Sequence, residues 1–203
     1  MIDVDRGSPP ASFAFGLGDT RFREDLCWIH RSKCYLTEAA ITASAMDVDH
    51  RIPRSDGGTD AWENLFPADP KANGHRTRRA PSGGYLSPGE GVETRLLQRV
   101  ELMPTGIQCI FAASDADDQP AANTAAELSR LHHDCGAWSK DLRYAIQAFL
   151  TYVLDLAVQQ AALTAADPGH AALTAKLRIE LSRNAPFTAL VRSKLPHLHA
   201  LFD

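Results

Sequence analysis

Between residues 46 and 76, the apolar and polar positions predict the order strand, loop, strand, helix. The first strand is indicated by apolar residues at even spacing that end at a proline, namely Met46, Val48, Ile52 and Pro53. Asp56-Gly57-Gly58 is typical of a loop that tolerates positive φ, and Asn64-Leu65-Phe66 predicts a short second strand. Pro67 and Pro70 suit the first turn of a following helix. The polar side chains of this unit therefore fall at its joints, where they can converge.

The same pattern predicts the elements on either side of this unit. Residues 1–6 indicate a short strand within an arm, and residues 21–30 indicate a helix with Asp19 or Thr20 as its N-cap. Residues 80–91 are rich in Pro, Gly and Ser and are typical of a connector. Residues 93–114 alternate around a Pro104-Thr105-Gly106 turn, which predicts a β-hairpin.

From residue 120 onward, the pattern is typical of helices. One predicted helix carries an apolar stripe at helical spacing, formed by Trp138, Leu142, Ile146, Phe149, Leu150, Val153 and Ala157. The apolar run over 149–163 is interrupted by Asp155, Gln159 and Gln160, so we expect a buried helix there and no membrane span. A further helix is predicted over 169–183, and a last one over 186–195 that Pro196 ends.

Together these elements predict an α+β fold in a chain of 203 residues, which is long enough to bury a sizeable core. We expect an N-terminal arm at 1–25, a strand–strand–helix unit at 26–80, a connector and β-hairpin at 81–118, and a mainly helical region at 119–203. Aromatic side chains are the candidates for packing the strand–strand–helix unit, namely Trp28, Tyr35, Trp62 and Phe66.

Composition limits how the chain can bind a partner. The net charge is −4, so the whole molecule is not a basic nucleic-acid binder, and such binding would need a local patch. Candidate cations for that patch surround the unit, namely Arg51, Arg54, Lys71, Arg76, Arg78 and Arg79. The alternative is a solvated helix end, where cations suit the C-terminal dipole. Four scattered cysteines with no signal peptide ahead of them favour reduced thiols in the cytoplasm.

Two adjacent side chains on the first strand carry the chemistry expected of this unit. Neighbours in a strand point to opposite faces, so Asp49 can hold a hard divalent cation while His50 takes a proton from water. Asn73 on the following helix offers a second oxygen ligand. Asn64 can tie the intervening loop by hydrogen bonds and fix the orientation of His50. Such a set suits phosphodiester hydrolysis, whose transition state needs charge stabilisation.

The whole string resembles the motif of the HNH endonucleases, the ββα-metal nucleases. The matching segments are Asp49-His50-x2-Pro53-x-Ser55-x-Gly57-Gly58, Glu63-Asn64-Leu65 and Asn73-x2-Arg76, with fourteen residues from His50 to Asn64 and nine more to Asn73. The resemblance implies that residues 26–80 form a ββα-metal nuclease domain with His50 as general base. It further implies that Asp49 and Asn73 bind Mg²⁺ or Mn²⁺ and that Asn64 is the middle asparagine of the motif. Some members end on histidine, so whether Asn73 or His75 is the last metal ligand stays open.

Cysteine and histidine clusters elsewhere have simpler interpretations. Many HNH proteins hold a structural zinc on two Cys-x2-Cys knuckles, but Tyr35-Leu36-Thr37 follows Cys34 and residues 69–72 contain no cysteine. We therefore expect no structural zinc, and we interpret Cys27 and Cys34 as small buried residues even though His30 lies between them. Two further clusters are read as helix-end residues and as a solvated acidic loop, namely His132, His133 and Cys135, and Asp115, Asp117 and Asp118.

Looser motifs across the chain are similar to those of HNH nucleases from bacterial antiphage systems of the Septu and retron-associated type. They are Met1-Ile2-x-Val4-x-Arg6, Pro9-Pro10, Tyr85-Leu86-Ser87, residues 119–124, and Ala185-Pro186-Phe187. This resemblance implies cleavage of nucleic acid beside a separate ATPase subunit, with DNA favoured as the substrate and RNA left open. The chain has no G-x-x-x-x-G-K-[ST] loop of its own, so ATP dependence would come from that partner. Two alternatives stay open: a stand-alone restriction or mobile-element nuclease, and an inactive HNH-like binding module for an ATPase partner.

Overall fold

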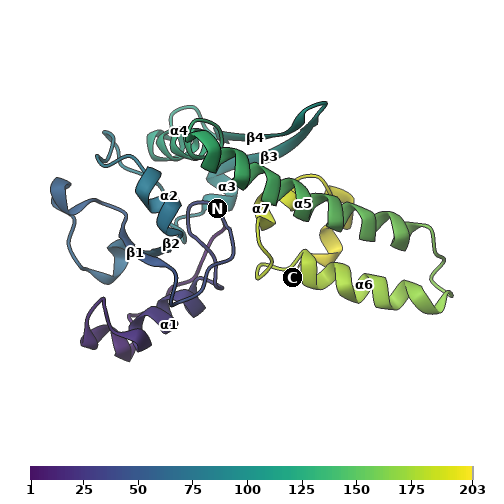
Figure 1. Cartoon of the computed structure of the whole chain (residues 1–203), viewed down its shortest axis with the longest axis horizontal. Helices are drawn as coiled ribbons and strands as arrows, with labels where there is room; N and C mark the ends of the chain where they lie inside the picture. The colour runs from purple at the N-terminus through teal and green to yellow at the C-terminus, as the bar shows by residue number, and fades with distance from the viewer. Residues whose placement is uncertain (203) are drawn as a thin grey trace.

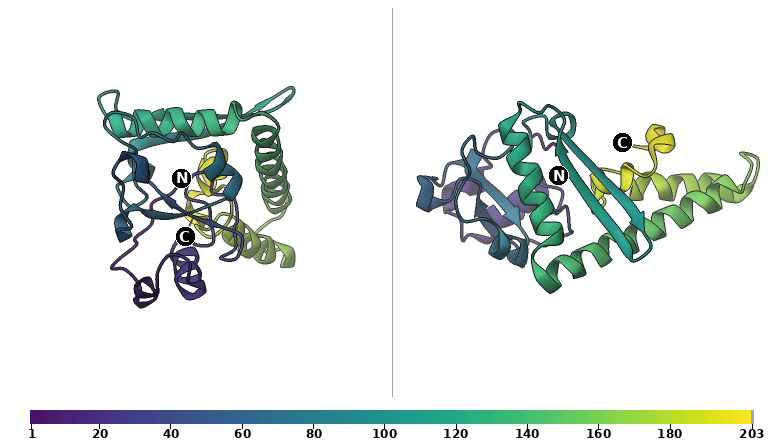
Figure 2. Two further views of the ribbon diagram at one scale, coloured as in Figure 1. Left: turned by 60° about the vertical axis from the view of Figure 1, so that its left-hand side comes forward. Right: turned by 90° about the horizontal axis from the view of Figure 1, so that it is seen from above.

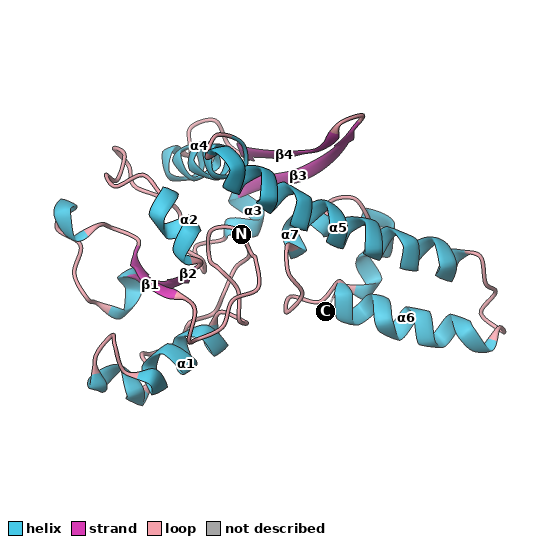
Figure 3. Ribbon diagram, in the orientation of Figure 1, coloured by secondary structure: helices cyan, strands magenta, loops and turns pink. Residues whose placement is uncertain are grey.

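The computed structural model describes residues 1–202, which mix helices and short strands (Figures 1 and 3). The elements in chain order are α1 (Thr20–Ile29), β1 (Asp47–His50), β2 (Leu65–Ala68), α2 (Pro70–His75), α3 (Val92–Arg95), β3 (Leu96–Met103), β4 (Gly106–Ala113), α4 (Gln119–His133), α5 (Gly136–Ala161), α6 (Pro168–Glu180) and α7 (Thr188–Arg192). The strands form two separate two-stranded antiparallel sheets, β1 with β2 and β3 with β4. The α+β class predicted from the sequence is confirmed.

The first sheet and the helix after it follow the predicted order. β1 pairs with β2 so that Asp49 lies opposite Phe66 and His50 lies opposite Leu65. Pro70 stands in the first turn of α2, as expected, and the Asp69 carboxylate caps that helix by accepting from the backbone N–H of Lys71 and Ala72. Pro67 departs from the prediction, because it lies within β2 rather than in the helix.

The second sheet is a hairpin whose burial alternates along each strand. β3 ends at Met103 and β4 begins at Gly106, so the turn lies where the Pro-Thr-Gly sequence predicts it. One face packs inward through Leu96, Val100, Ile107, Cys109 and Phe111, all of which are buried. The turn of the hairpin lies beside α5 (Figure 2), since a Cβ at Gly106 would be 3.6 Å from Oε1 of Gln147 on that helix.

The helical region starts and stops at slightly different residues than the sequence indicates. α4 begins at Gln119, because Asp118 accepts from the Ala121 N–H as its cap. α5 buries Leu142, Ile146, Leu150 and Val153 along the predicted stripe. α6 and α7 are shorter than expected, at Pro168–Glu180 and Thr188–Arg192. α5 and α6 run side by side away from the two sheets (Figures 1 and 2).

A single large hydrophobic cluster joins the first sheet to the hairpin and the helices. It contains Tyr35 and Phe66 from the N-terminal part, Val100 and Phe111 from the hairpin, and Leu150 from α5. A second, smaller cluster contains Phe22, Leu26, Cys27, Met46, Trp62 and Leu65 beneath α1. Burial of this shared core holds the first sheet against the helical region, so the region beyond residue 80 completes the core of the N-terminal unit.

Two N-terminal expectations are wrong. Trp28 is 82% exposed on α1 and packs no core, because the inward face of that helix carries Phe22, Leu26 and Cys27. Residues 1–6 form no strand, yet the arm is anchored by side chains. Met1, Ile2 and Val4 are buried, and the Asp3 carboxylate accepts from the backbone N–H of Val92 and Glu93 at the start of α3.

A search of residues 1–202 for membrane-crossing helices finds none of sufficient length and apolar character, α5 included.

Candidate nuclease site

Asp49 is buried on the inward face of β1 and takes part in an ion pair. The residue as a whole is only 8% exposed. One oxygen, Oδ2, accepts hydrogen bonds from Tyr35 Oη at 2.5 Å and from Arg76 Nη1 at 2.6 Å. Burial, followed by the nearby Asp49 carboxylate, raises the pKa of Tyr35 well above its usual value, so the phenol keeps its proton and donates. The other oxygen, Oδ1, receives no donor from residues 1–202.

Arg76 acts as the internal partner of Asp49. The same guanidinium donates to His50 O at 2.8 Å and to Arg51 O, so it fastens α2 to the end of β1. Burial lowers the pKa of Arg76, but the neighbouring Tyr35 oxygen and Asp49 carboxylate outweigh that effect, so the pKa is raised. This result corrects the prediction that Arg76 lies on a phosphate-binding rim, because the residue is 7% exposed and its donors point inward.

A second contact joins the same strand face to the same helix. Asn73 Nδ2 donates to Asp47 Oδ2 at 3.0 Å. Asp47 and Asp49 share one face of β1 because side chains alternate along a strand, and Asn73 and Arg76 share one face of α2 because they are three residues apart. The Asp47–Asn73 and Asp49–Arg76 hydrogen bonds are therefore neighbouring contacts that join β1 to α2.

These two contacts leave one oxygen atom on each of three side chains without a hydrogen-bond donor. Within residues 1–202, no hydrogen bond reaches Oδ1 of Asp47, Asp49 or Asn73. Carboxylate and amide oxygens are the ligands that Mg²⁺ and Mn²⁺ prefer, so the donor chemistry fits such a cation. This fit requires the amide oxygen of Asn73 in addition to the carboxylates. The described residues contain no group of three His, Cys, Asp or Glu side chains placed to hold a metal.

His75 faces away from this set. Its exposed imidazole stacks on the Trp138 ring of α5, with centroids 5.1 Å apart and an interplanar angle of 23°. Its backbone carbonyl accepts from Arg130 Nη2 at 2.5 Å. Of the two residues left open by the sequence, Asn73 is the one that the structure brings beside Asp47.

His50 lies on the opposite face of β1 and reaches the glycine loop. Its Nε2 lies 2.7 Å from Oδ1 of Asp60, a residue that the sequence did not single out. Arg54 donates to the same carboxylate oxygen through Nη2 at 2.5 Å, and its Nε lies 3.2 Å from His50 Nε2. Hydrogen bonds from His50 and then from Arg54 lower the pKa of Asp60.

Asn64 ties the loop that carries Asp60. Its Oδ1 accepts from Ile52 N at 2.7 Å, and its Nδ2 donates to Ile52 O at 3.1 Å and to Thr59 O at 2.9 Å. The loop passes so close to the strand that a Cβ at Gly58 would lie 1.7 Å from Ile52 O. The predicted loop-tying role of Asn64 agrees with these contacts, although none of them is made to the His50 side chain.

Asn64→Ala is expected to lower the free energy of unfolding by about 1–3 kcal/mol, because the substitution removes the partners of three backbone groups. For a chain of this size, that corresponds to roughly 2–4 °C in Tm for each kcal/mol, measured by calorimetry. Thr59→Ala is the matched control, since it keeps the carbonyl that Asn64 binds. A Tm for Asn64→Ala equal to that of Thr59→Ala would contradict this role.

The predicted cationic residues divide into exposed and engaged groups. Lys71 is exposed in the first turn of α2, and Arg78 and Arg79 are exposed just after its C-terminal end. Arg54 is exposed but paired with Asp60. Arg51 is half-buried and donates to Tyr85 O at 2.7 Å. A rim built from Lys71, Arg78 and Arg79 is therefore the part of the prediction that stands open to a phosphate backbone.

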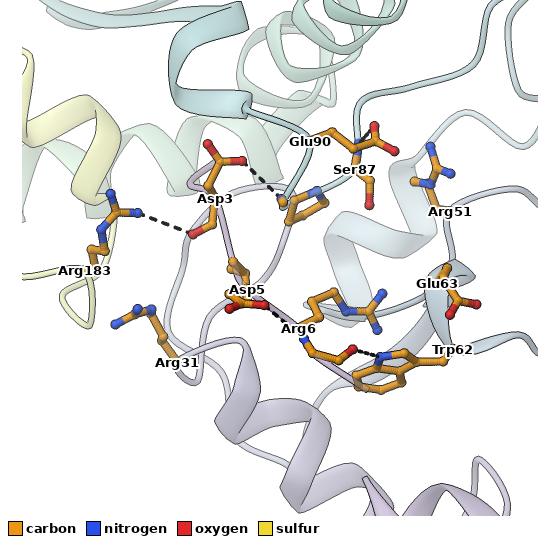
Figure 4. A pocket seen from close by; sticks show the side chains of 14 residues that line it. Asp3, Asp5, Arg6, Arg31, Arg51, Trp62, Glu63, Ser87, Glu90 and Arg183 are labelled. Carbon is orange, nitrogen blue, oxygen red and sulfur yellow. Dashed lines mark hydrogen bonds between the residues drawn. The ribbon is translucent and has the colours of Figure 1, made fainter. Parts of the chain in front are cut away.

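An open cavity of about 620 Å³ lies between the N-terminal arm and residues 87–90 (Figure 4). Arg6 lines this cavity. Its Cζ atom lies 4.0 Å from the centroid of the Trp62 ring, and its Nη2 donates to Leu65 O at 2.6 Å. Arginines and acids line the cavity in equal number, with Arg6, Arg31, Arg51 and Arg183 facing Asp3, Asp5, Glu63 and Glu90. The lining thus favours neither anionic nor cationic ligands.

The cysteine and histidine clusters are packed into the interior. Cys27 and Cys34 are buried, and His30 lies edge-on against Phe66 with ring centroids 5.5 Å apart. Burial, together with the charge of Arg6, lowers the pKa of His30 to about 3, so this imidazole is neutral. On α4, His132 is buried and its Nδ1 lies 2.7 Å from Leu128 O.

Comparison with known proteins gives one match. The family model described as HNH endonuclease matches residues 27–79, the segment that contains Asp49, His50, Asn64 and Asn73. Searches of curated proteins and of solved structures found no match to the chain. The matched segment spans the strand–strand–helix unit, its glycine loop and the helix that carries Asn73. Residues 27–79 are therefore similar to the HNH endonuclease family.

Proposed function

We propose that the protein is a metal-dependent endonuclease that hydrolyses phosphodiester bonds of nucleic acid, with DNA as the favoured substrate. The observation that carries the proposal is the arrangement around β1 within the HNH domain. His50 reaches the glycine loop from one face, and on the other Asp47 contacts Asn73 and Asp49 contacts Arg76. A base and a hard-cation site on opposite faces of one strand are the two parts that this hydrolysis needs.

Each residue of the site has its own role in the proposed hydrolysis. His50 accepts the proton of the attacking water, whose oxygen then bonds to phosphorus as the leaving oxygen departs. Asp47, Asp49 and Asn73 would hold the cation, and Arg76 orients Asp49 by donating to its Oδ2. A bound Mg²⁺ or Mn²⁺ supplies charge stabilisation to the phosphate in the transition state. Lys71, Arg78 and Arg79 give the exposed positive charge that positions the backbone.

The metal assignment predicts a specific defect in Asn73→Ala. Chelation by EDTA is expected to stop cleavage, and added Mg²⁺ or Mn²⁺ to restore it. Asn73→Ala should raise the Mg²⁺ concentration for half-maximal cleavage about tenfold or more, because it removes one ligand and frees Asp47 from its hydrogen bond. His75→Ala is the matched control from the same helix and should keep the wild-type Mg²⁺ dependence.

Two outcomes would contradict this assignment. Equal Mg²⁺ dependence in Asn73→Ala and wild type would remove Asn73 from the site, and a raised requirement in His75→Ala would move the role there. Metal analysis that finds tightly held zinc on Cys27, His30 and Cys34 would overturn our account of the scaffold.

At a finer level, we propose that the protein is the nuclease subunit of an antiphage defence complex with a separate ATPase. The resemblance to Septu and retron-associated nucleases supports this assignment. The α5–α6 pair supports it too, since it extends beyond the rest of the chain (Figure 2) and exposes Val158 and Ile179 on its surface. Exposed apolar side chains on a projecting element suit a protein partner better than a nucleic acid, which requires positive charge.

The complex is tested by co-purification with the ATPase of the neighbouring gene. Full-length wild type is expected to retain the ATPase, whereas the double variant Val158→Asp/Ile179→Asp should lose it while keeping its Tm.

Infected cells that express the pair should resist phage, and cells with His50→Ala should not. Retention of the ATPase by the double variant would contradict docking on this surface, and no co-purification at all would favour the stand-alone restriction or mobile-element nuclease.

A second candidate function has one observation in its favour. Asp49 is already compensated by Arg76 and Tyr35 in a buried ion pair, which suits a purely structural carboxylate. That arrangement is compatible with an HNH-like binding module without activity. Plasmid nicking separates the two candidates, because the module would leave supercoiled DNA intact under every metal condition while still binding its partner.

A further inference from the structure

The loop residue Asp60 makes the shortest polar contact to the His50 ring. The Nε2 of His50 and the Oδ1 of Asp60 are 2.7 Å apart. The His50 side chain is 16% exposed and the Asp60 side chain 52%, so the pair lies at the surface with His50 the more enclosed member. No residue within 1–202 hydrogen-bonds the other ring nitrogen, Nδ1.

The short contact favours a proton on the ring nitrogen that faces Asp60. An ionised carboxylate only accepts hydrogen bonds, so a contact of this length requires a proton on Nε2. The Arg54 Nε contact, at 3.2 Å, is longer, and Arg54 already donates to Asp60 Oδ1 at 2.5 Å. Neutral imidazole has one N–H, so Nδ1 keeps its lone pair and is the basic atom of the ring.

The loop that presents Asp60 is itself held rigidly. Gly57 adopts a left-handed conformation with φ of 86°, and Gly58 has no space for a side chain. Asn64 then fastens Thr59, the residue directly before Asp60, through a 2.9 Å hydrogen bond to its carbonyl. Asn64 therefore acts on His50 indirectly, through Thr59 and Asp60, and not by touching the ring.

We propose that Asp60 is a positioning residue that holds His50 with its proton on Nε2 and directs Nδ1 to the attacking water. The claim that Nδ1 acts on the attacking water rests on the proposed nuclease function. The claim that Asp60 holds the proton on Nε2 does not. A residue that fixes the tautomer and the ring angle of a base is expected to change kcat and leave substrate binding unaltered.

The tautomer is read directly from the ¹⁵N shifts of the imidazole nitrogens in the metal-free, full-length protein at about pH 8, where an ordinary imidazole is neutral. The His50 signals are identified by their absence in His50→Ala. In wild type we expect the pattern of a protonated Nε2 and an unprotonated Nδ1. In Asp60→Ala we expect a mixture of both tautomers, and in Asp60→Asn, whose amide oxygen still accepts, a pattern closer to wild type.

Cleavage kinetics give the second readout. Asp60→Ala should lower kcat about ten- to a hundredfold with KM unchanged, and Asp60→Asn should recover part of the loss. Glu63→Gln is the matched control, because it removes an exposed acid from the same loop that makes no contact with His50. The exposed position of Asp60 predicts a wild-type Tm for all three variants.

The outcomes separate the two levels of the account. A wild-type ring protonated on Nδ1, or an Asp60→Ala variant with unchanged tautomer and kcat, would overturn the positioning role. A change in KM alone would also overturn it, because it would make Asp60 a binding residue. If the wild type cleaves no substrate, the proposed function fails, and the ¹⁵N shifts still decide whether Asp60 sets the His50 tautomer.

Discussion

His50→Ala is expected to lower the cleavage rate by about two to four orders of magnitude, because it removes the general base from the attacking water. The measurement is single-turnover nicking of supercoiled plasmid with saturating Mg²⁺. Within residues 1–202, the His50 side chain hydrogen-bonds only to the exposed residues Asp60 and Arg54, so its loss should leave Tm close to that of wild type.

The control for His50→Ala is His197→Ala, which removes an exposed histidine far along the chain and should cleave like wild type. Near-wild-type cleavage by His50→Ala would remove the proposed mechanism. A large fall in Tm would show instead that the loss of activity comes from unfolding.

Arg76→Met is expected to have the largest effect on stability. It leaves the buried Asp49 carboxylate without its ion-pair partner and removes two further bonds to the carbonyls of His50 and Arg51. Breaking a buried pair by removing one partner costs about 3–5 kcal/mol. At roughly 2–4 °C for each kcal/mol in a chain of this size, Tm should fall by about 10 °C, measured by calorimetry.

Two comparisons make the Arg76 result specific. Arg78→Met removes an exposed cation two residues away and should change the free energy of unfolding by no more than about 0.5 kcal/mol. The double variant Asp49→Asn/Arg76→Met should recover part of the lost stability, because no charge is then left buried and unpaired. A Tm for Arg76→Met within 1–2 °C of wild type, on the order expected for a surface change, would contradict the ion pair.

The sequence predicted the elements of the HNH domain because its signals are local. Even spacing of apolar residues placed β1, and Pro70 marked the start of α2. Adjacency of Asp49 and His50 in a strand was enough to assign them to opposite faces. The same alternation could have identified Asp47, since Asp47-x-Asp49 repeats an acid at the strand period.

Other features of the site depend on contacts between residues far apart in the sequence. Asp60 belongs to a polar loop with no periodicity, so nothing local marks it as the partner of His50. Arg76 stands in a run of cations and resembles a solvated residue until the fold brings it against Asp49. Trp28 shows the reverse case, because an aromatic residue favours burial on composition alone, whereas its position on α1 points outward.

The sequence predicted a strand–strand–helix unit at 26–80 and a helical region at 119–203, joined by a Pro- and Gly-rich connector. In the structure, Tyr35 and Phe66 share one hydrophobic cluster with Val100 of the hairpin and Leu150 of α5. Apolar patterns indicate which face of a helix is buried but not which partner covers it, so a shared core could not be read from the sequence.

Metal-dependent cleavage is tested by incubating the purified full-length protein with supercoiled plasmid in Mg²⁺, in Mn²⁺ and in EDTA. Nicked or linear DNA is expected with either metal, and intact supercoiled DNA is expected with EDTA. Plasmid that stays supercoiled in both metals, or that is cut equally well in EDTA, would contradict the assignment of a metal-dependent HNH nuclease.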